Sequence, residues 1–164
     1  MNRIIRKAIV ADIPSITEIY EQARQFMAAN GNPTQWVNGY PNEATIRGDL
    51  HRDQLYVCVD GNSIVGVFCY FMDTEPDYLT IHDGAWLKDG PYGVVHRIAS
   101  ADGHKGVASM CLNYAFAQCG DLRIDTHRDN IPMQRLLNKN GFQRCGLILL
   151  RKDGTERIAY QKIQ

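Results

Sequence analysis

Residues 94–142 constrain the fold of this chain more than any other segment. Their hydrophobic pattern and glycines predict a strand, a glycine turn, a helix, a second strand and a second helix. Gly103 and Gly106 lie where the first strand gives way to the first helix, so the backbone there can approach a ligand without a Cβ in between. The free N–H groups and the dipole of a helix start favour negative charge. We therefore expect a phosphorylated ligand at this turn, with His104 and Lys105 adding positive charge.

The glycine turn is also compatible with a different ligand or with no ligand. A P-loop is excluded, because no glycine is followed after four residues by Gly-Lys-Ser/Thr. The hexapeptide 101–106 is one substitution from the dinucleotide fingerprint G-x-G-x-x-G, and Asp125 ends the next strand near where a ribose contact would lie. Against this, Ala101 occupies the position of the first glycine, and only one such unit is visible. The simplest alternative is a connection whose glycines serve the turn alone.

Two blocks of residues carry a family resemblance. The run 103–108, GHKGVA, matches the second half of the signature Gln/Arg-x-x-Gly-x-Gly/Ala, with Gly103 in place of the initial Gln or Arg. The second block is a strand, an asparagine at a helix start and a helix ending in Gly-Phe, matched by Asn130, Leu136, Leu137, Gly141 and Phe142. In the order and spacing of these blocks the chain resembles the GNAT superfamily of N-acetyltransferases, from residue 3 to about residue 162.

The resemblance implies a mixed α/β fold with a central, mostly antiparallel sheet of about seven strands and four helices. It also implies that the sheet is splayed between the strands at 93–101 and 122–127. Acetyl-CoA would be the co-substrate, with its pyrophosphate on the glycine turn and its pantetheine arm paired with the backbone of Ile98 and Ser100. The expected cofactor-binding residues are Ile98, Ala99, Ser100, Gly103, His104, Lys105, Gly106, Val107, Ala108, Asn130 and Met133.

Proton transfer needs a base for the amine and an acid for the departing thiolate. The family often uses a tyrosine on the last helix as the acid, and Leu137 stands at that position here. Leucine cannot donate a proton, so another group or water must do so. Among the rings within reach, Tyr92 precedes the strand at 93–101 and His96 lies on it.

The two histidine candidates each have a structural alternative. Strand alternation puts His96 on one face with Val94, Ile98 and Ser100, where it would be a base or a hydrogen-bonded core residue. His127 is expected to share a face with Asp125, a pair that would orient an imidazole for proton transfer or cap the following helix. The predicted catalytic residues are His96, Tyr92 and His127.

Aromatic residues in two connections are candidates for acceptor binding. In GNAT proteins the connection between the first two helices covers the acceptor pocket, so the resemblance points to Trp36 and Tyr40. Trp86 lies in the long polar connection 73–91, which has room for a short strand around residues 78–81. We expect the acceptor to be a small-molecule or peptide amine. The structural alternative is that the first connection merely covers the core.

Length and composition narrow the choice of function. The 164 residues suit a single domain over 1–164, and Lys plus Arg equal Asp plus Glu at 18 each, so we expect no nucleic-acid partner. No apolar run reaches the length of a membrane helix, and the first residues lack a secretory signal. The five cysteines form no C-x-x-C pair, which indicates free thiols and a cytoplasmic location. The histidines lack metal-ligand spacing, so no metal is expected, while a homodimer through the C-terminal strands stays open.

These features together predict an acetyl-CoA-dependent N-acetyltransferase that transfers the acetyl group directly from the thioester to an amine. Two alternatives stay open. A non-catalytic acyl-CoA-binding module is favoured by Leu137, and a nicotinamide-dependent oxidoreductase is favoured by the near-match to the dinucleotide fingerprint.

Overall fold

A computed structural model describes residues 2–164 and contains seven strands, four α-helices and two short 3-10 helices. In chain order these are β1 (Arg3–Lys7), η1 (Val10–Asp12), α1 (Ile13–Ala29), α2 (Glu43–His51), β2 (Leu55–Asp60), β3 (Ser63–Met72), η2 (Pro76–Tyr78), β4 (Gly93–Ser100), α3 (Val107–Cys119), β5 (Asp121–Thr126), α4 (Ile131–Lys139), β6 (Gln143–Leu149) and β7 (Glu156–Ile163).

All seven strands form one sheet in the order β1-β2-β3-β4-β5-β7-β6. Every neighbouring pair is antiparallel except β4 and β5, which are parallel. The prediction of a mixed, mostly antiparallel sheet with four helices is therefore confirmed. A parallel pair needs a crossover connection, and α3 supplies it between β4 and β5.

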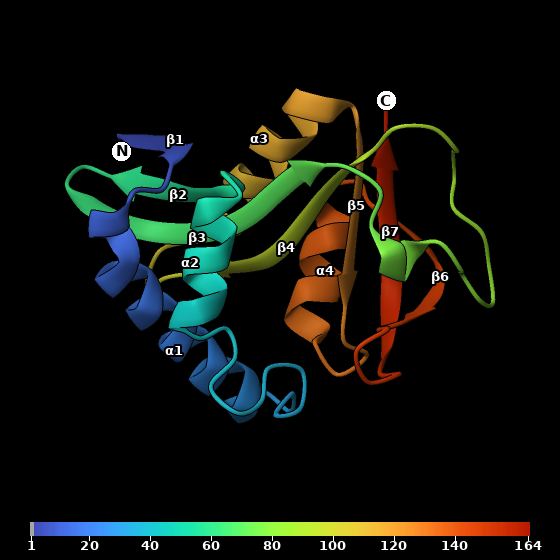
Figure 1. Ribbon diagram of the computed structural model, residues 1–164, viewed down its shortest axis with the longest axis horizontal. Helices are drawn as coiled ribbons and strands as arrows, with labels where there is room; N and C mark the ends of the chain where they lie inside the picture. The colour runs from blue at the N-terminus through green and yellow to red at the C-terminus, as the bar shows by residue number, and fades with distance from the viewer. Residues whose placement is uncertain (1) are drawn as a thin grey trace.

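Helices cover both faces of the sheet (Figure 1). One face carries α1 and α2, whose residues Ile16, Tyr20 and Ile46 pack against Val57 and Val67 of the sheet. The opposite face carries α3 and α4, which share a core that includes Cys111, Leu112, Ile124 and Leu137. Successive side chains of β2 and β3 point alternately into the two cores, so both faces of these central strands are buried and their sequences are almost continuously apolar.

Local signals in the sequence explain where the helices start. Asn42 caps α2 by accepting a hydrogen bond from the Thr45 N–H at 2.9 Å, and Asn130 caps α4 by accepting one from the Met133 N–H at 3.1 Å. Gly141, with a φ of 84°, follows the end of α4 in the conformation that glycine adopts most easily.

The long connection between β3 and β4 corrects one expectation. Residues 78–81 do not form a strand; the segment contains η2 and a single bridge between His82 and Leu147. Tyr78 is buried there against Val94, Ile148 and Ala159, so the connection covers the face of the sheet opposite α4. Among residues 2–164, no helix is long and apolar enough to cross a bilayer.

Candidate functional site

The sheet opens at its parallel pair. Only Gly93 and Val94 of β4 pair with β5, opposite Leu122 and Arg123, and the two strands then diverge, as Figure 1 shows. The predicted splay between these strands is confirmed. A cleft of about 490 Å³ occupies the gap; its walls come from β4, β5, the loop after α1, the connection after β3 and the start of β7. Beyond Val94, the edge of β4 that faces this cleft has no strand partner among the described residues.

A bulge in β4 shapes the wall of the cleft. Val67 and Cys69 of β3 pair with Ala99 and His96, so one residue of β3 faces two of β4. Arg97 has a φ of 52°, and its guanidinium is held by the Asp49 carboxylate through bonds of 2.8 and 2.7 Å.

The bulge changes which residues share a face with His96, so one expectation from the sequence is wrong. Val95 and Ile98 both pack in the core beneath α3, although three positions separate them. His96 instead contacts the connection after β3, and Arg97 contacts α2. His96 therefore shares a face with Val94 but not with Ile98, because the extra residue reverses the alternation.

The turn between β4 and α3 is an open anion cradle. Gly103 and Gly106 have φ values of 77° and 78°, a conformation that other residues rarely adopt. Among residues 2–164, no acceptor takes the backbone N–H groups of residues 103–109. An added Cβ at Gly103 would meet nothing within 4 Å, so these glycines are required by backbone conformation and not by crowding. Free N–H groups at a helix start fit a pyrophosphate.

Contacts from distant segments hold the cradle in place. The Arg3 Nη1 donates to the Lys105 carbonyl at 2.6 Å, and the Asp102 N–H donates to Gln22 Oε1 at 3.2 Å. A Cβ built at Gly66 of β3 would lie 2.4 Å from Val107 Cγ1, so this glycine lets the start of α3 sit directly on the sheet. Sequence reasoning did not identify Gly66, because nothing near it in the chain reveals a helix above it.

The predicted cofactor-binding residues lie along one track. Ile98, Asn130 and Met133 line the cleft, and Ala99 and Ser100 follow at the end of β4. The exposed residues His104 and Lys105 lie in the cradle loop, and Val107 and Ala108 begin α3. Asn130 has a structural use as well, since its side chain caps α4 and donates to Gln35 Oε1 at 3.0 Å.

His96 and Glu75 form the main titratable pair of the cleft. The His96 Nε2 lies 3.0 Å from Glu75 Oε2, and both residues line the cleft. Burial alone would raise the pKa of Glu75, but the hydrogen bond from His96, together with its charge whenever the imidazole is protonated, leads to a net lowering. Glu75 therefore stays ionised and holds the imidazole. Sequence reasoning selected His96 but could not find its partner, which is 21 positions away.

Tyr92 supports this pair from outside the cleft. Its hydroxyl accepts a hydrogen bond from the Glu75 N–H at 2.9 Å, and its ring lies 3.8 Å from the Arg123 guanidinium carbon. Tyr92 is not among the residues that line the cleft. Its placement therefore supports a role in positioning Glu75 better than direct proton transfer.

His127 and Asp125 are not brought together. The Asp125 Oδ2 accepts from the buried Tyr78 hydroxyl at 2.7 Å, whereas His127 Nδ1 accepts from the Asp129 N–H at 3.0 Å. His127 Nε2 lies 3.3 Å from Thr34 Oγ1. Burial, together with the nearby Arg157 charge, lowers the pKa of His127. The expected pairing of Asp125 with His127 is therefore wrong. His127 instead links the loop after α1 to the end of β5, outside the cleft.

Two of the three predicted acceptor-binding aromatics line the cleft. Trp36 packs edge-on between Tyr20 and Tyr40, and both Trp36 and Tyr40 face the cleft. Trp86 does not: its indole N–H donates to the Tyr78 carbonyl at 3.0 Å, and its ring stacks on Arg123. The placement of Trp86 thus does not support contact with an acceptor.

Two further side chains bear on proton transfer. Leu137 is fully buried in the core under α3 and α4, so the position offers no acid. The Thr126 hydroxyl is buried without a partner among the described residues, and Thr126 lines the cleft. The described residues contain no cluster of three or more His, Cys, Asp or Glu side chains that would hold a metal ion.

Comparison with known proteins places this geometry in a family. Residues 15–142 match the acetyltransferase (GNAT) family. A GNAT-family acetyltransferase from Streptococcus agalactiae is 34% identical, with 99% of this chain and 95% of that chain covered and a TM-score of 0.85. No curated protein sequence matches this chain.

Two more distant structures share the fold. A ribosomal-protein-alanine N-acetyltransferase from Brucella melitensis is 20% identical, with 98% and 99% of the two chains covered and a TM-score of 0.63. A chain of the NatC complex bound to Gag peptide and CoA is 14% identical, with 100% of this chain and 99% of that chain covered, also at a TM-score of 0.63.

Proposed function

This chain belongs to the acetyltransferase (GNAT) family, and we propose that it acetylates the primary amine of a small molecule or peptide with acetyl-CoA. One observation carries the proposal: β4 lines the cleft as far as Ile98 and then leads into a turn whose N–H groups, from residue 103 to residue 109, have no acceptor among residues 2–164. A pyrophosphate fits that turn, and an extended, amide-bearing arm fits the unpaired edge of β4.

The residues of this track have separate tasks. Residues 103–109 would bind the pyrophosphate, and the backbone of Ile98 and Ser100 would receive the amide-bearing arm, with Met133 beside it. Acetyl-CoA supplies an activated acetyl group as a thioester. The bulge at Arg97 sets the direction of the following backbone N–H, that of Ile98, which we assign to the developing oxyanion.

His96 acts as the base in this proposal. If Nε2 donates to the Glu75 carboxylate, Nδ1 keeps the lone pair that can take a proton from the amine. Phe71 and Tyr78 flank the imidazole, with ring centroids 5.7 and 6.2 Å away, and limit its movement. Because Leu137 is aliphatic, the departing thiolate takes its proton from water or from another group of the cleft.

The nicotinamide alternative loses its support. A doubly wound dinucleotide fold requires several parallel strands, whereas β4 and β5 are the only parallel pair among the described residues. The single unit β4-α3-β5 is flanked by antiparallel pairs, of β4 with β3 and of β5 with β7, which such a fold does not use.

Calorimetric titration with acetyl-CoA, with NADH as the parallel ligand, tests the proposal. We expect acetyl-CoA to bind and NADH not to bind. Gly106→Glu should abolish acetyl-CoA binding, because the new carboxylate repels the phosphates and fills the cradle. Gly154→Glu is the matched control, since Gly154 also has a positive φ and free space but lies in the turn between β6 and β7. Normal acetyl-CoA binding by Gly106→Glu would show that the site is misplaced.

A screen of amines for thiol release then tests the reaction itself. Wild-type protein should release free CoA thiol in the presence of its acceptor, and the product should carry an acetylated amine. Binding of acetyl-CoA without thiol release for any amine class would contradict catalysis and leave only the binding function.

A further inference from the structure

Arg157, at the start of β7, is a buried cation without a counter-ion among the residues that the structure describes. The residue is 6% exposed, and within residues 2–164 its guanidinium donates only to two backbone carbonyls, of Glu156 at 3.2 Å and Gln35 at 3.4 Å. No carboxylate of residues 2–164 lies within 4.0 Å of it. Burying an unpaired charge is unfavourable unless something compensates it.

Two other arginines, the partly buried Arg97 and the buried Arg123, show how such a charge is compensated in this protein. Arg97 is bidentate to Asp49, and these bonds raise its pKa against the opposing effect of burial. Arg123 lies between the rings of Trp86 and Tyr92, 4.1 and 3.8 Å from their centroids. Arg157 has neither arrangement. Burial lowers its pKa. The charges of Asp125 and Asp153 oppose this lowering, but both carboxylates lie farther away than an ion pair allows.

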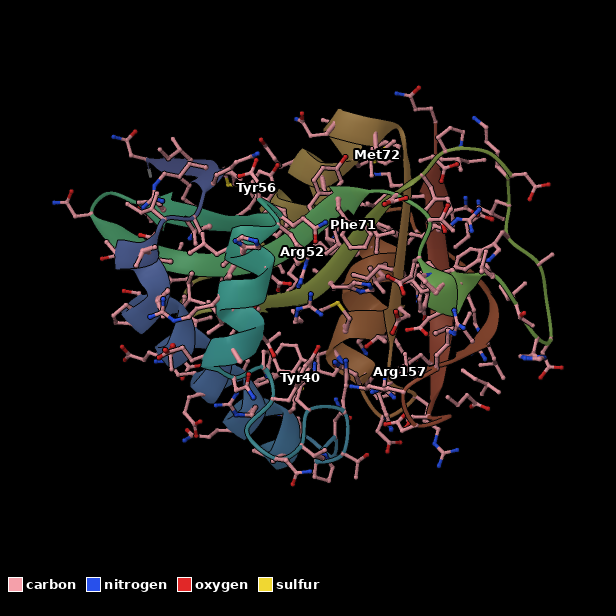
Figure 2. All side chains as sticks on the ribbon, viewed as in Figure 1. Tyr40, Arg52, Tyr56, Phe71, Met72 and Arg157 are labelled. Atoms are coloured by element: carbon pink, nitrogen blue, oxygen red, sulfur yellow. The ribbon has the colours of Figure 1, made fainter. Side chains whose placement is uncertain are left out.

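Arg157 faces the acceptor end of the cleft. It lines the cleft together with Tyr40 and Lys152, and Figure 2 shows Tyr40 and Arg157 at the same end of the gap between the two halves of the sheet. The Lys152 Nζ lies 4.7 Å from the Tyr40 ring centroid, and the Tyr40 hydroxyl accepts from Arg97 at 3.1 Å. A positive region thus surrounds Tyr40 on a wall separate from the glycine cradle.

Negative charge gathers on a different part of the same cleft. Asp73 and Glu75 come from the connection after β3 and line the cleft, with Glu75 against His96. Asp77 lies nearer the cationic side, because its Oδ1 accepts from the N–H of Arg151, the neighbour of Lys152, and the carboxylate of Asp125 is bound by the Tyr78 hydroxyl. The cleft therefore offers a carboxylate-rich region where the amine would react and a cation-rich region at Arg157 and Lys152. Such a division of charge suits a ligand that carries both an amine and an anion. The planar guanidinium fork matches a carboxylate.

We infer that the acceptor is an amino acid or another amine that bears a carboxylate, with Arg157 binding the carboxylate and Lys152 adding charge beside it. This inference rests on the proposed N-acetyltransferase function and specifies its substrate class. The amine would lie toward His96 and Glu75, so the acceptor spans the cleft from β4 to β7.

Matched pairs of acceptors test this assignment. Glycine, β-alanine, 4-aminobutanoate and 6-aminohexanoate place the carboxylate at increasing distances from the amine, and the primary amide of each removes the charge with little change of shape. We expect wild-type protein with acetyl-CoA to prefer at least one acid over its amide. In Arg157→Gln the kcat/KM for that acid should fall about 10- to 100-fold, as for loss of a charged hydrogen bond, while that for its amide changes little.

Three variants separate binding from folding. Lys152→Gln alters an exposed residue and should produce a smaller loss in the same direction. Arg157→Lys keeps the charge and should restore part of the preference. Arg47→Gln, on the exposed face of α2 and paired with Glu43, is the control that should leave the preference intact.

A binding measurement without turnover completes the test. The acids should raise the melting temperature of the wild-type protein, with and without CoA, more than their amides do, and Arg157→Gln should abolish this difference. Equal binding or turnover of acids and amides by the wild-type protein would overturn the inference while leaving the N-acetyltransferase function intact. Failure to release thiol from any amine, with acids still bound through Arg157, would contradict the catalytic function alone.

Discussion

Asp49 of α2 accepts two hydrogen bonds from Arg97 of β4, from Nε at 2.8 Å and from Nη2 at 2.7 Å. Asp49 is 1% exposed, and Arg97 lies at the bulge with a φ of 52°, where a non-glycine residue is strained. The pair therefore holds one strand of the cleft in a conformation that its backbone alone would not keep. Arg52 Nη2 adds a third bond to the same carboxylate at 2.9 Å.

Asp49→Asn should destabilise the protein and reduce its activity. Removing one charge of a buried pair leaves the other uncompensated and typically costs about 3–5 kcal/mol. Denaturant unfolding measures this loss, and kcat should fall as the bulge relaxes. Glu43→Gln is the control, because its exposed pair with Arg47 should contribute less than about 1 kcal/mol. Equal losses from the two variants would refute the structural importance of the pair.

His96→Ala should lower turnover without weakening acetyl-CoA binding. Loss of a general base usually reduces the rate by about 10²- to 10⁴-fold, whereas the glycine cradle that holds the cofactor is untouched. Steady-state kinetics and calorimetry measure the two quantities separately. Glu75→Gln should reduce kcat less, because the imidazole remains but loses its orienting carboxylate. His51→Ala, at the end of α2, serves as the control, and unchanged turnover in His96→Ala would exclude His96 as the base.

Gly66→Ala should weaken acetyl-CoA binding from a site outside the cradle. The new methyl group would meet Val107 Cγ1 at 2.4 Å, so the start of α3 must move away from the sheet. Overpacking of this kind costs about 1–3 kcal/mol, measurable by denaturant unfolding, and the displaced N–H groups should raise the dissociation constant of acetyl-CoA.

The matched control for this glycine is Gly48→Ala in α2. The nearest atoms to a methyl group there belong to the end of the Arg52 side chain, at 3.2 Å, which is more than half exposed and can shift while Asp49 keeps both of its bonds to Arg97; alanine also favours a helix. Gly48→Ala should therefore leave acetyl-CoA binding unchanged. If Gly66→Ala binds acetyl-CoA as tightly as this control, the close contact between β3 and α3 does not determine the cradle.

His127 should make stability depend on pH. Burial and the Arg157 charge lower its pKa in the folded protein, so the unfolded chain binds more protons below the ordinary value of about 6.5. The contribution of His127 is then fully present above that value and declines as the pH falls through the folded-state pKa. Urea unfolding at pH 7.5 and 5.5 should show a smaller decline in His127→Gln than in the wild type. An identical decline in both proteins would refute the assignment.

The sequence was sufficient to predict the fold because local patterns in a fixed order carry the resemblance to a known family, and that resemblance implied the sheet and its opening. Alternating apolar strands, the helix starts at Asn42 and Asn130 and the glycines of the turn each act within a few residues. The prediction of a mixed, mostly antiparallel sheet that parts between β4 and β5 is confirmed, as is the family. The short strand expected at residues 78–81 was wrong, because burial of Tyr78 and not local propensity shapes that segment.

The tertiary structure alone decided which side chains meet in the cleft. His96 contacts Glu75, which is 21 positions away in the chain, and Arg97 contacts Asp49, which is 48 positions away. Arg157 donates to the carbonyl of Gln35, which is 122 positions away. A bulge of a single residue places Ile98 and His96 on opposite faces of β4, and no local pattern in that strand predicts it. Local patterns determine where strands and helices form, but only packing between distant segments determines which charges are paired and which, like Arg157, have no counter-ion in the described part of the chain.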